Sequence, residues 1–152
     1  MNLTILSFNW HEPYLCLLAD IGHKFLIIEP EVTPNNCRRW DKNMREIPLN
    51  VQLISQNEAT AKLDKGEIDI VIAHNIQDLV ALRSYILPKI LVFHNKLSTE
   101  LLLSDQICLR DAYLKKIEPL LTDVKKIFIS EGKRQDWNMV GEVITPGIDV
   151  DK

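Results

Sequence analysis

The chain has 152 residues, of which 46% are hydrophobic and 26% are charged, the ordinary mixture of a globular protein. Its formal net charge is −3, from 18 basic and 21 acidic residues. This balance argues against a nucleic-acid binder, because such proteins depend on neutralising phosphates. The apolar runs are far shorter than the roughly 20 residues that span a bilayer, and no charged segment precedes an apolar one as in a signal peptide. We therefore expect one domain, over residues 1–152, without a transmembrane segment.

The cysteines indicate a reducing compartment. Cys16, Cys37 and Cys108 are an odd number at wide spacing, and they form neither a CxxC pair nor a metal-binding pattern. We expect reduced thiols in a cytoplasmic protein, with no bound metal ion and no cofactor.

Short apolar runs alternate with segments of helical spacing along the whole chain. The runs predict strands at residues 3–8, 24–29, 51–54, 68–73, 89–93, 126–129 and 142–144. The helical spacing predicts helices at residues 12–21, 57–65, 75–85 and 105–118. Asp105 is a suitable N-cap for the last helix, and Pro119 should end it.

This alternation predicts the fold class. Strands that alternate with helices every ten to fifteen residues are typical of βαβ units, and continuous apolar strands are typical of a sheet covered on both faces. We expect an α/β, Rossmann-like open parallel sheet of about six or seven strands, with helices on both faces.

Residues 30–48 interrupt the alternation with prolines, asparagines and charges of both signs. We expect a long loop here, with at most one short helix around Trp40. Trp40 and Trp137 are expected to anchor the core or an interface, and Trp10 to pack under the first loop.

Polar side chains follow the predicted strands at the edge where open α/β sheets bind ligands. The candidates at this edge are Asn9, His11, Glu12, His74, His94, Asn95, Ser130, Lys133 and Arg134. Three of the four histidines are among them. A histidine beside helix N-termini can orient a hydroxyl group or take a proton near neutral pH.

Ordinary structural roles stay open for the same residues. Asparagine and serine after a strand are common helix N-caps, and Glu12 suits the first turn of a helix through the helix dipole alone. The Lys133–Arg134 pair is also compatible with a solvated basic turn. The chain has no GxGxxG, GxxxxGK[ST], HExxH or GxSxG motif, so no dinucleotide, P-loop, zinc-protease or hydrolase signature is present.

Three segments carry a resemblance to a known family. A strand ends in VFHN at residues 92–95, a later strand leads into ISEGKR at 129–134, and VITPGID follows at 143–149. The opening NWHEPY at 9–14 and the Gly22-His23 pair complete the pattern. Together they resemble the N-terminal domain of a GT-B-fold glycosyltransferase of the retaining family-four type.

The resemblance implies a function shared between two domains. It implies that this domain contributes mainly to acceptor binding, and that a C-terminal domain with an ExxxxxxxE motif binds the nucleotide-sugar. His94 would then be the catalytic residue that lines the donor sugar. Asn9, His11 and Glu12 would shape the acceptor side, and Lys133 and Arg134 could face phosphate. The acceptor could be a sugar, a lipid or a glycan, peripheral contact with a membrane stays open, and residues 1–152 should be inactive alone.

Two other functions remain open at this stage. The chain could be a self-contained flavodoxin-like ligand-binding or regulatory domain, or a scaffold without chemistry. The transferase interpretation requires Asn9, His74, His94 and Ser130 to lie on one edge of the molecule.

Overall fold

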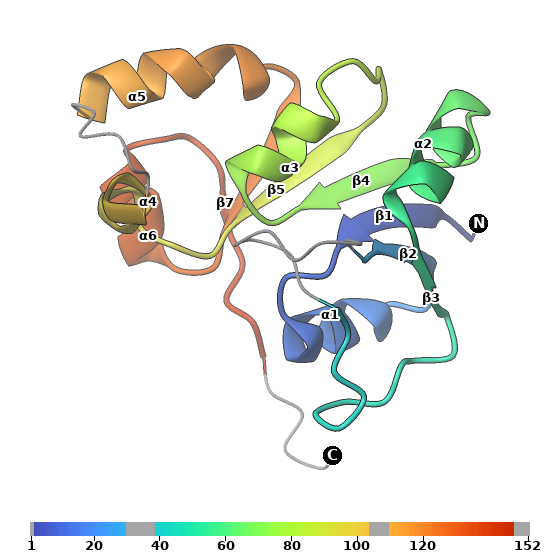
Figure 1. The fold of residues 1–152 in the computed structure, drawn as a ribbon. Coiled ribbons are helices and arrows are strands. Elements are labelled where there is room, and N and C mark those ends of the chain that lie inside the picture. The colour runs from blue at the N-terminus through green and yellow to red at the C-terminus, as the bar shows by residue number, and fades with distance from the viewer. Residues whose placement is uncertain (1, 30–38, 104–109, 148–152) are drawn as a thin grey trace.

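The computed structural model of the chain describes residues 2–29, 39–103 and 110–147. Its centre is a parallel sheet of seven strands (Figure 1). The strands are β1 (Thr4–Phe8), β2 (Lys24–Ile28), β3 (Val51–Ile54), β4 (Ile70–Ala73), β5 (Lys89–Phe93), β6 (Val124–Phe128) and β7 (Glu142–Val143). The predicted Rossmann-like α/β fold is confirmed.

The strand order is β3-β2-β1-β4-β5-β6-β7, and every pairing is parallel. The order reverses at β1, because the chain proceeds outward through β2 and β3 and then returns to place β4 on the other side of β1. An open α/β sheet forms its ligand crevice at such a reversal, outside the carboxyl ends of the strands. The order differs from the 2-1-3-4-5 order of flavodoxin-like sheets, so the topology is not flavodoxin-like.

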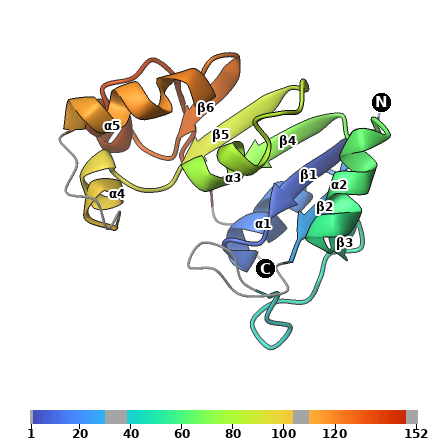
Figure 2. The same ribbon diagram turned by 45° about the horizontal axis from the view of Figure 1, so that its top comes forward.

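Helices cover both faces of the sheet, as predicted. They are α1 (Glu12–Ala19), α2 (Gln56–Asp64), α3 (Ile76–Ala81), α4 (Leu97–Leu103), α5 (Arg110–Ile117), α6 (Glu131–Trp137) and the 3-10 turn η1 (Glu118–Leu120). In Figure 1, α1 lies below the sheet, whereas α2, α3 and α5 lie above it. The turned view in Figure 2 keeps α1 and α3 on opposite sides of β1 and β4.

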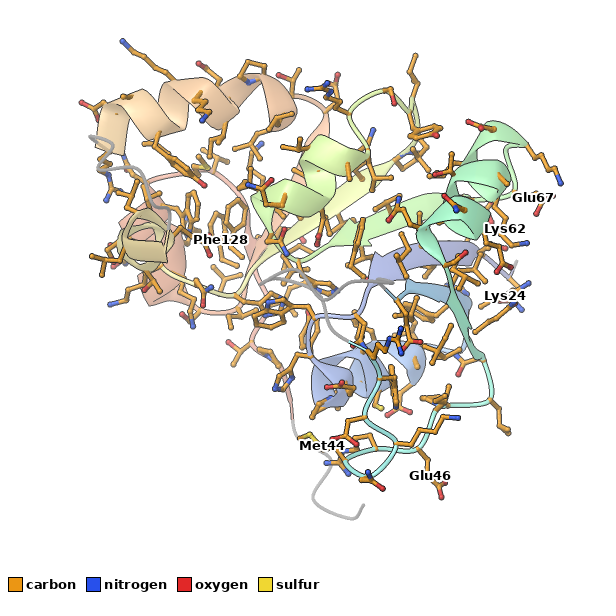
Figure 3. All side chains as sticks on the ribbon, in the orientation of Figure 1. Lys24, Met44, Glu46, Lys62, Glu67 and Phe128 are labelled. Carbon is orange, nitrogen blue, oxygen red and sulfur yellow. The ribbon has the colours of Figure 1, made fainter. Side chains whose placement is uncertain are left out.

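Alternation along β1 divides its side chains between the two faces. Ile5 belongs to an apolar cluster with Leu15 and Ala19 of α1. Leu6 and Phe8 face the other way, in a cluster with residues of α2. A third cluster joins β5 and β6 to α3, α5 and α6, and there Phe128 stacks on Phe93 with ring centroids 4.5 Å apart. Figure 3 shows Phe128 directed into this cluster.

The predicted strands are confirmed with small shifts at their ends, but the helices differ more. The helix expected at 75–85 ends at Ala81, and only four helices were expected where the described residues contain six α-helices. The missed helices are α4 and α6, which are seven residues each and too short for a clear apolar period. The helix α5 ends at Ile117, just before Pro119, as expected. Asp105, its expected N-cap, lies outside the described residues.

The segment 39–50 folds back against the α1 face of the sheet without forming a helix, so the short helix expected around Trp40 is not present in the described part of this segment. Trp40 is nonetheless buried in the same cluster as α1, as expected of an anchor. Its indole donates a hydrogen bond to the backbone oxygen of Arg45 at 2.8 Å, and its backbone N–H donates to the Glu29 carboxylate. Met44 and Glu46 project away from this anchored segment (Figure 3). Residues 30–38 of the predicted loop lie outside the described residues.

Gly141 lies where the chain enters β7 against β6. A Cβ atom at this position would be 2.7 Å from the Phe128 ring and 2.8 Å from the backbone oxygen of Lys126. The backbone of β6 cannot move away from such a Cβ atom without disturbing the sheet. We therefore expect Gly141→Ala to lower the free energy of unfolding by about 1–3 kcal/mol, measured by urea denaturation. Gly132→Ala in α6 is the control, because a Cβ there meets nothing within 4 Å. Equal stability of the two variants would contradict this prediction.

Candidate functional site at the strand reversal

The carboxyl ends of β1, β4 and β5 bring three predicted site residues together. Ser7 of β1 pairs with Ile72 of β4, so the same register places Asn9 beside His74. The ring of Trp10 lies 4.2 Å from that of His94 and 6.2 Å from that of His74, centroid to centroid. The loop after β1 therefore reaches across the ends of β4 and β5. Ser130 follows β6 at the same end of the sheet, so the four residues share one edge as expected.

The two histidines form a buried hydrogen-bonded chain with Ser7. His74 Nε2 lies 2.8 Å from Ser7 Oγ, and His74 Nδ1 lies 3.1 Å from His94 Nε2. Ser7 Oγ also donates to the backbone oxygen of Ile72 at 2.8 Å. The exposed fraction is 0% for Ser7, 4% for His74 and 8% for His94, so this polar chain is nearly dry.

Aromatic rings enclose the histidine pair. Trp10 lies against the His94 ring at an interplanar angle of 30°, and Tyr14 of α1 meets the same ring edge-on with centroids 4.7 Å apart. Tyr14 also meets His74 edge-on at 5.7 Å. This packing restricts how either imidazole can turn, so the ring nitrogens keep defined directions.

Burial keeps both imidazoles neutral. Loss of solvent lowers the pKa of His74 to about 3, with a further contribution from His94. Loss of solvent also lowers the pKa of His94 to about 4, and the charges of His11 and Lys133 add to this effect. Near neutral pH each ring therefore has one protonated and one unprotonated nitrogen.

Asp78 supports the His74 backbone from α3. Its Oδ2 accepts a hydrogen bond from the His74 backbone N–H at 2.8 Å, and its own backbone N–H donates to Oδ1 of the N-cap Asn75 at 2.9 Å. Burial raises the pKa of Asp78 to about 7, because the three hydrogen bonds that favour its charged form offset only part of the lost solvation.

Asn9 is the most unusual residue of the edge. Its exposed fraction is 0%, yet neither Oδ1 nor Nδ2 of its side chain has a hydrogen-bond partner within the described part of the chain. Buried polar groups are nearly always paired, so an amide in this state requires an explanation such as a ligand or an ordered water. Glu12, also fully buried, accepts a hydrogen bond from the backbone N–H of Asp41 at 3.3 Å.

The remaining predicted residues have more ordinary surroundings. His11 is the exposed N-cap of α1 and makes no side-chain capping bond. Asn95 donates to Glu100 at 2.9 Å, and Ser130 caps α6 by accepting from the Lys133 backbone N–H at 3.4 Å. The Arg134 guanidinium binds Glu131 of its own helix through two hydrogen bonds, so the structure gives it a partner away from the histidines.

Four residues of the site were not among the predicted site residues: Ser7, Trp10, Tyr14 and Asp78. The available signals were weak. Ser7 is a polar residue inside an apolar strand, and Asp78 stands three residues after an asparagine that begins a helix. Only the strand register shows that Ser7 meets His74.

A narrow hollow between the ends of β4 and β5 is lined by His74, His94, Asn95, Glu100 and Trp137, among others. A larger hollow of about 510 Å³ lies at the amino ends of β5 and β6, lined by Arg83, Tyr85, Lys89 and Asp123, among others. Lys89, one of the cations that line it, already donates to the backbone oxygen of Leu87 at 3.5 Å. We place the functional site at the histidine edge, because the neutral histidines and the unpartnered amide lie there.

Comparison with known proteins adds no assignment: no protein-family model matches the chain, and no curated protein matches its sequence significantly. Within residues 2–29, 39–103 and 110–147, no helix has the length and apolar character needed to cross a membrane. Across these same ranges, no three His, Cys, Asp or Glu side chains gather closely enough to hold a metal ion.

The opposed pKa shifts of this site predict an unusual pH dependence. Between about pH 4.5 and 6, the unfolded chain protonates His74 and His94, whereas the folded chain protonates only Asp78. The unfolded state thus binds about one extra proton, and these groups lower stability on acidification by about 1.4 kcal/mol per pH unit. Asp78→Asn removes the opposing proton, so this loss should approach about 2.7 kcal/mol per pH unit. Urea denaturation across this range measures both slopes, and equal slopes would contradict the shifts.

A second prediction concerns Asn9. Because its buried amide has no protein partner among the described residues, Asn9→Ala should leave the unliganded protein equally stable or more stable. Asn50 is the matched control, since its amide donates to the backbone oxygens of Ala19 at 2.8 Å and His23 at 2.7 Å. We expect Asn50→Ala to cost about 2 kcal/mol in thermal or urea unfolding. A similar cost for Asn9→Ala would show that Asn9 is structural.

Proposed function

We propose that this domain is the acceptor-side lobe of a glycosyltransferase, which transfers a sugar from a nucleotide-sugar with retention at the anomeric carbon. The observation that carries the proposal is the convergence of Asn9, His74 and His94 at the strand reversal. Donor and acceptor would meet above this edge, where a second, donor-binding lobe faces it. We place its action in the cytoplasm, in keeping with the unpaired Cys16.

The chemistry of the edge suits hydroxyl groups better than phosphates. The imidazoles are neutral, and the free amide of Asn9 offers both a donor and an acceptor. A hydroxyl group needs both kinds of partner, whereas a phosphate needs donors and positive charge. The indole of Trp10 adds an apolar surface next to these groups, of the kind on which a sugar ring can stack.

The proposed roles follow from position. His94 would be the catalytic residue, bonded to a hydroxyl of the transferred sugar, and Asn9 would bind the acceptor. Lys133 is the cation whose charge reaches His94, so it would face the phosphates of the donor. His11 and Glu12 would shape the acceptor side from the start of α1, whereas Asn95, Ser130 and Arg134 have partners that suit a supporting role.

The division into lobes supplies the first test. Residues 1–152 alone should transfer no sugar from any nucleotide-sugar, whereas a polypeptide that joins them to a donor-binding lobe should do so. The assay measures release of the nucleoside diphosphate from each nucleotide-sugar in turn. Turnover by residues 1–152 alone would refute the assignment.

The role of His94 supplies the second test, in the two-lobed polypeptide. We expect His94→Ala to lower kcat about 10²–10³-fold, the effect of losing one preorganised contact to the transition state. Because the buried ring packs against Trp10 and Tyr14, the melting temperature should fall as well, so kcat is measured at a temperature where the variant is folded. His23→Ala is the control, because His23 lies between α1 and β2 at the other end of the sheet. A kcat for His94→Ala equal to that of the control would remove His94 from the mechanism.

A further inference from the structure

Ser7 determines which groups donate and which accept in the hydrogen-bonded chain of Ser7, His74 and His94. The backbone oxygen of Ile72 can only accept, so the single hydroxyl proton of Ser7 points to it across 2.8 Å. The other contact of Ser7 Oγ, to His74 Nε2 at 2.8 Å, then needs its proton from the imidazole. His74 must therefore be protonated at Nε2.

The position of the proton on His74 in turn determines which nitrogen of His94 is protonated. His74 is buried and neutral, so with its proton at Nε2 its Nδ1 carries a lone pair. That lone pair lies 3.1 Å from Nε2 of His94, which must donate. His94 is then protonated at Nε2, and its other nitrogen, Nδ1, is unprotonated while the ring is neutral.

We propose that Ser7 and His74 are positioning residues that fix His94 in the Nε2–H tautomer, so that Nδ1 of His94 accepts a hydrogen bond from a hydroxyl group of the ligand. The ligand class is thus a polyol or a sugar. The identity of this hydroxyl as part of a transferred sugar rests on the proposed function, whereas the tautomer does not.

The surroundings of His94 leave Nδ1 for a ligand. Within the described ranges, the hydrogen bond of the His94 side chain is the one to His74, and no group pairs with Nδ1. Trp10 and Tyr14 hold the ring by its face and edge, so they stabilise its orientation without using either nitrogen. Burial is the main reason that the ring does not take a second proton, with smaller contributions from His11 on the loop and Lys133 on α6. A second proton would turn this acceptor into a donor.

The same geometry disfavours a phosphodiester or the diphosphate of a nucleotide-sugar as the direct partner of this nitrogen. The oxygens of these groups carry no proton near neutral pH, so they and an unprotonated imidazole nitrogen are both hydrogen-bond acceptors. Lys133 can hold a phosphate nearby, but the bond at Nδ1 requires an O–H or N–H group.

The test is a proton–nitrogen NMR correlation spectrum of the 152-residue chain with isotope-labelled histidine, near neutral pH. This spectrum distinguishes the protonated from the unprotonated ring nitrogen of each histidine. We expect His74 and His94 both to be Nε2–H tautomers. An Nδ1–H tautomer or a charged ring at His94 would overturn the proposal. This spectrum is recorded on the unsubstituted chain, so its result does not depend on the folding of a variant.

Ser7→Ala tests the positioning role. Without the hydroxyl, His74 can place its proton on Nδ1 and donate to His94, so the Nδ1–H tautomer of His94 should become detectable. Ser55→Ala is the matched control, since Ser55 caps α2 by accepting from the Glu58 backbone N–H at 3.2 Å and lies outside the histidine chain. It should leave both tautomers unchanged. An unchanged His94 in folded Ser7→Ala would show that Ser7 does not set the tautomer.

Titration of the labelled chain tests the ligand class, with myo-inositol and inorganic sulfate, an anion without a proton near neutral pH, as the two probes. We expect myo-inositol to move the His94 Nδ1 resonance while this nitrogen stays unprotonated. A resonance that moves only with sulfate, or with neither probe, overturns the hydroxyl assignment. None of these NMR measurements depends on sugar transfer. A failed transferase assay and a wrong tautomer assignment therefore give different results.

Discussion

The parallel register of β1, β4 and β5 is the constraint on which the site depends. Ser7 faces Ile72 and Ala73 faces Leu91, so the polar residues that end these strands meet at one edge. A slip of β1 by one residue would turn Ser7 to the opposite face of the sheet and break its bond to Ile72. Alternation in turn fixes the face that each side chain of β1 takes, because Ile5 packs against α1 while Leu6 and Phe8 pack against α2. The apolar core and the imidazole chain are therefore two results of the same pairing.

Two kinds of buried polar group stand side by side at this edge. Ser7 and His74 are fully paired, so in a dry environment they make a rigid network with defined proton positions. Asn9, in contrast, is buried without partners in the described structure. A paired network preserves geometry, whereas an unpartnered amide lowers the stability of the empty protein. Their combination is expected where a fold keeps one side of a site fixed and leaves the other side to be completed by a ligand.

The sequence was sufficient to predict the sheet and the edge, but not the connections within the edge. Strands such as Val51–Ile54 and Lys89–Phe93 were predicted to the residue, because short runs of mostly apolar residues between turn signals have few alternatives. The helix α6 was missed because its seven residues are mostly polar and its one buried side chain is Trp137. The clustering of His74 and His94 followed from parallel topology alone. The role of Ser7 did not, since it depends on which residues of β1 and β4 face each other, and single sequences do not specify pairing register.

The apolar interior is divided into three clusters, and the division has a consequence for motion. The cluster around Phe93 and Phe128 includes α3, α5 and α6, whereas β1, β2 and β3 contribute to the other two. Such clusters can open as separate cooperative units, detectable by amide hydrogen exchange. Asn9 follows β1 and His94 follows β5, the two strands that flank β4. A small molecule held by both would tie these strands together, and slower exchange would then extend across β4 into parts of the chain that the molecule never touches.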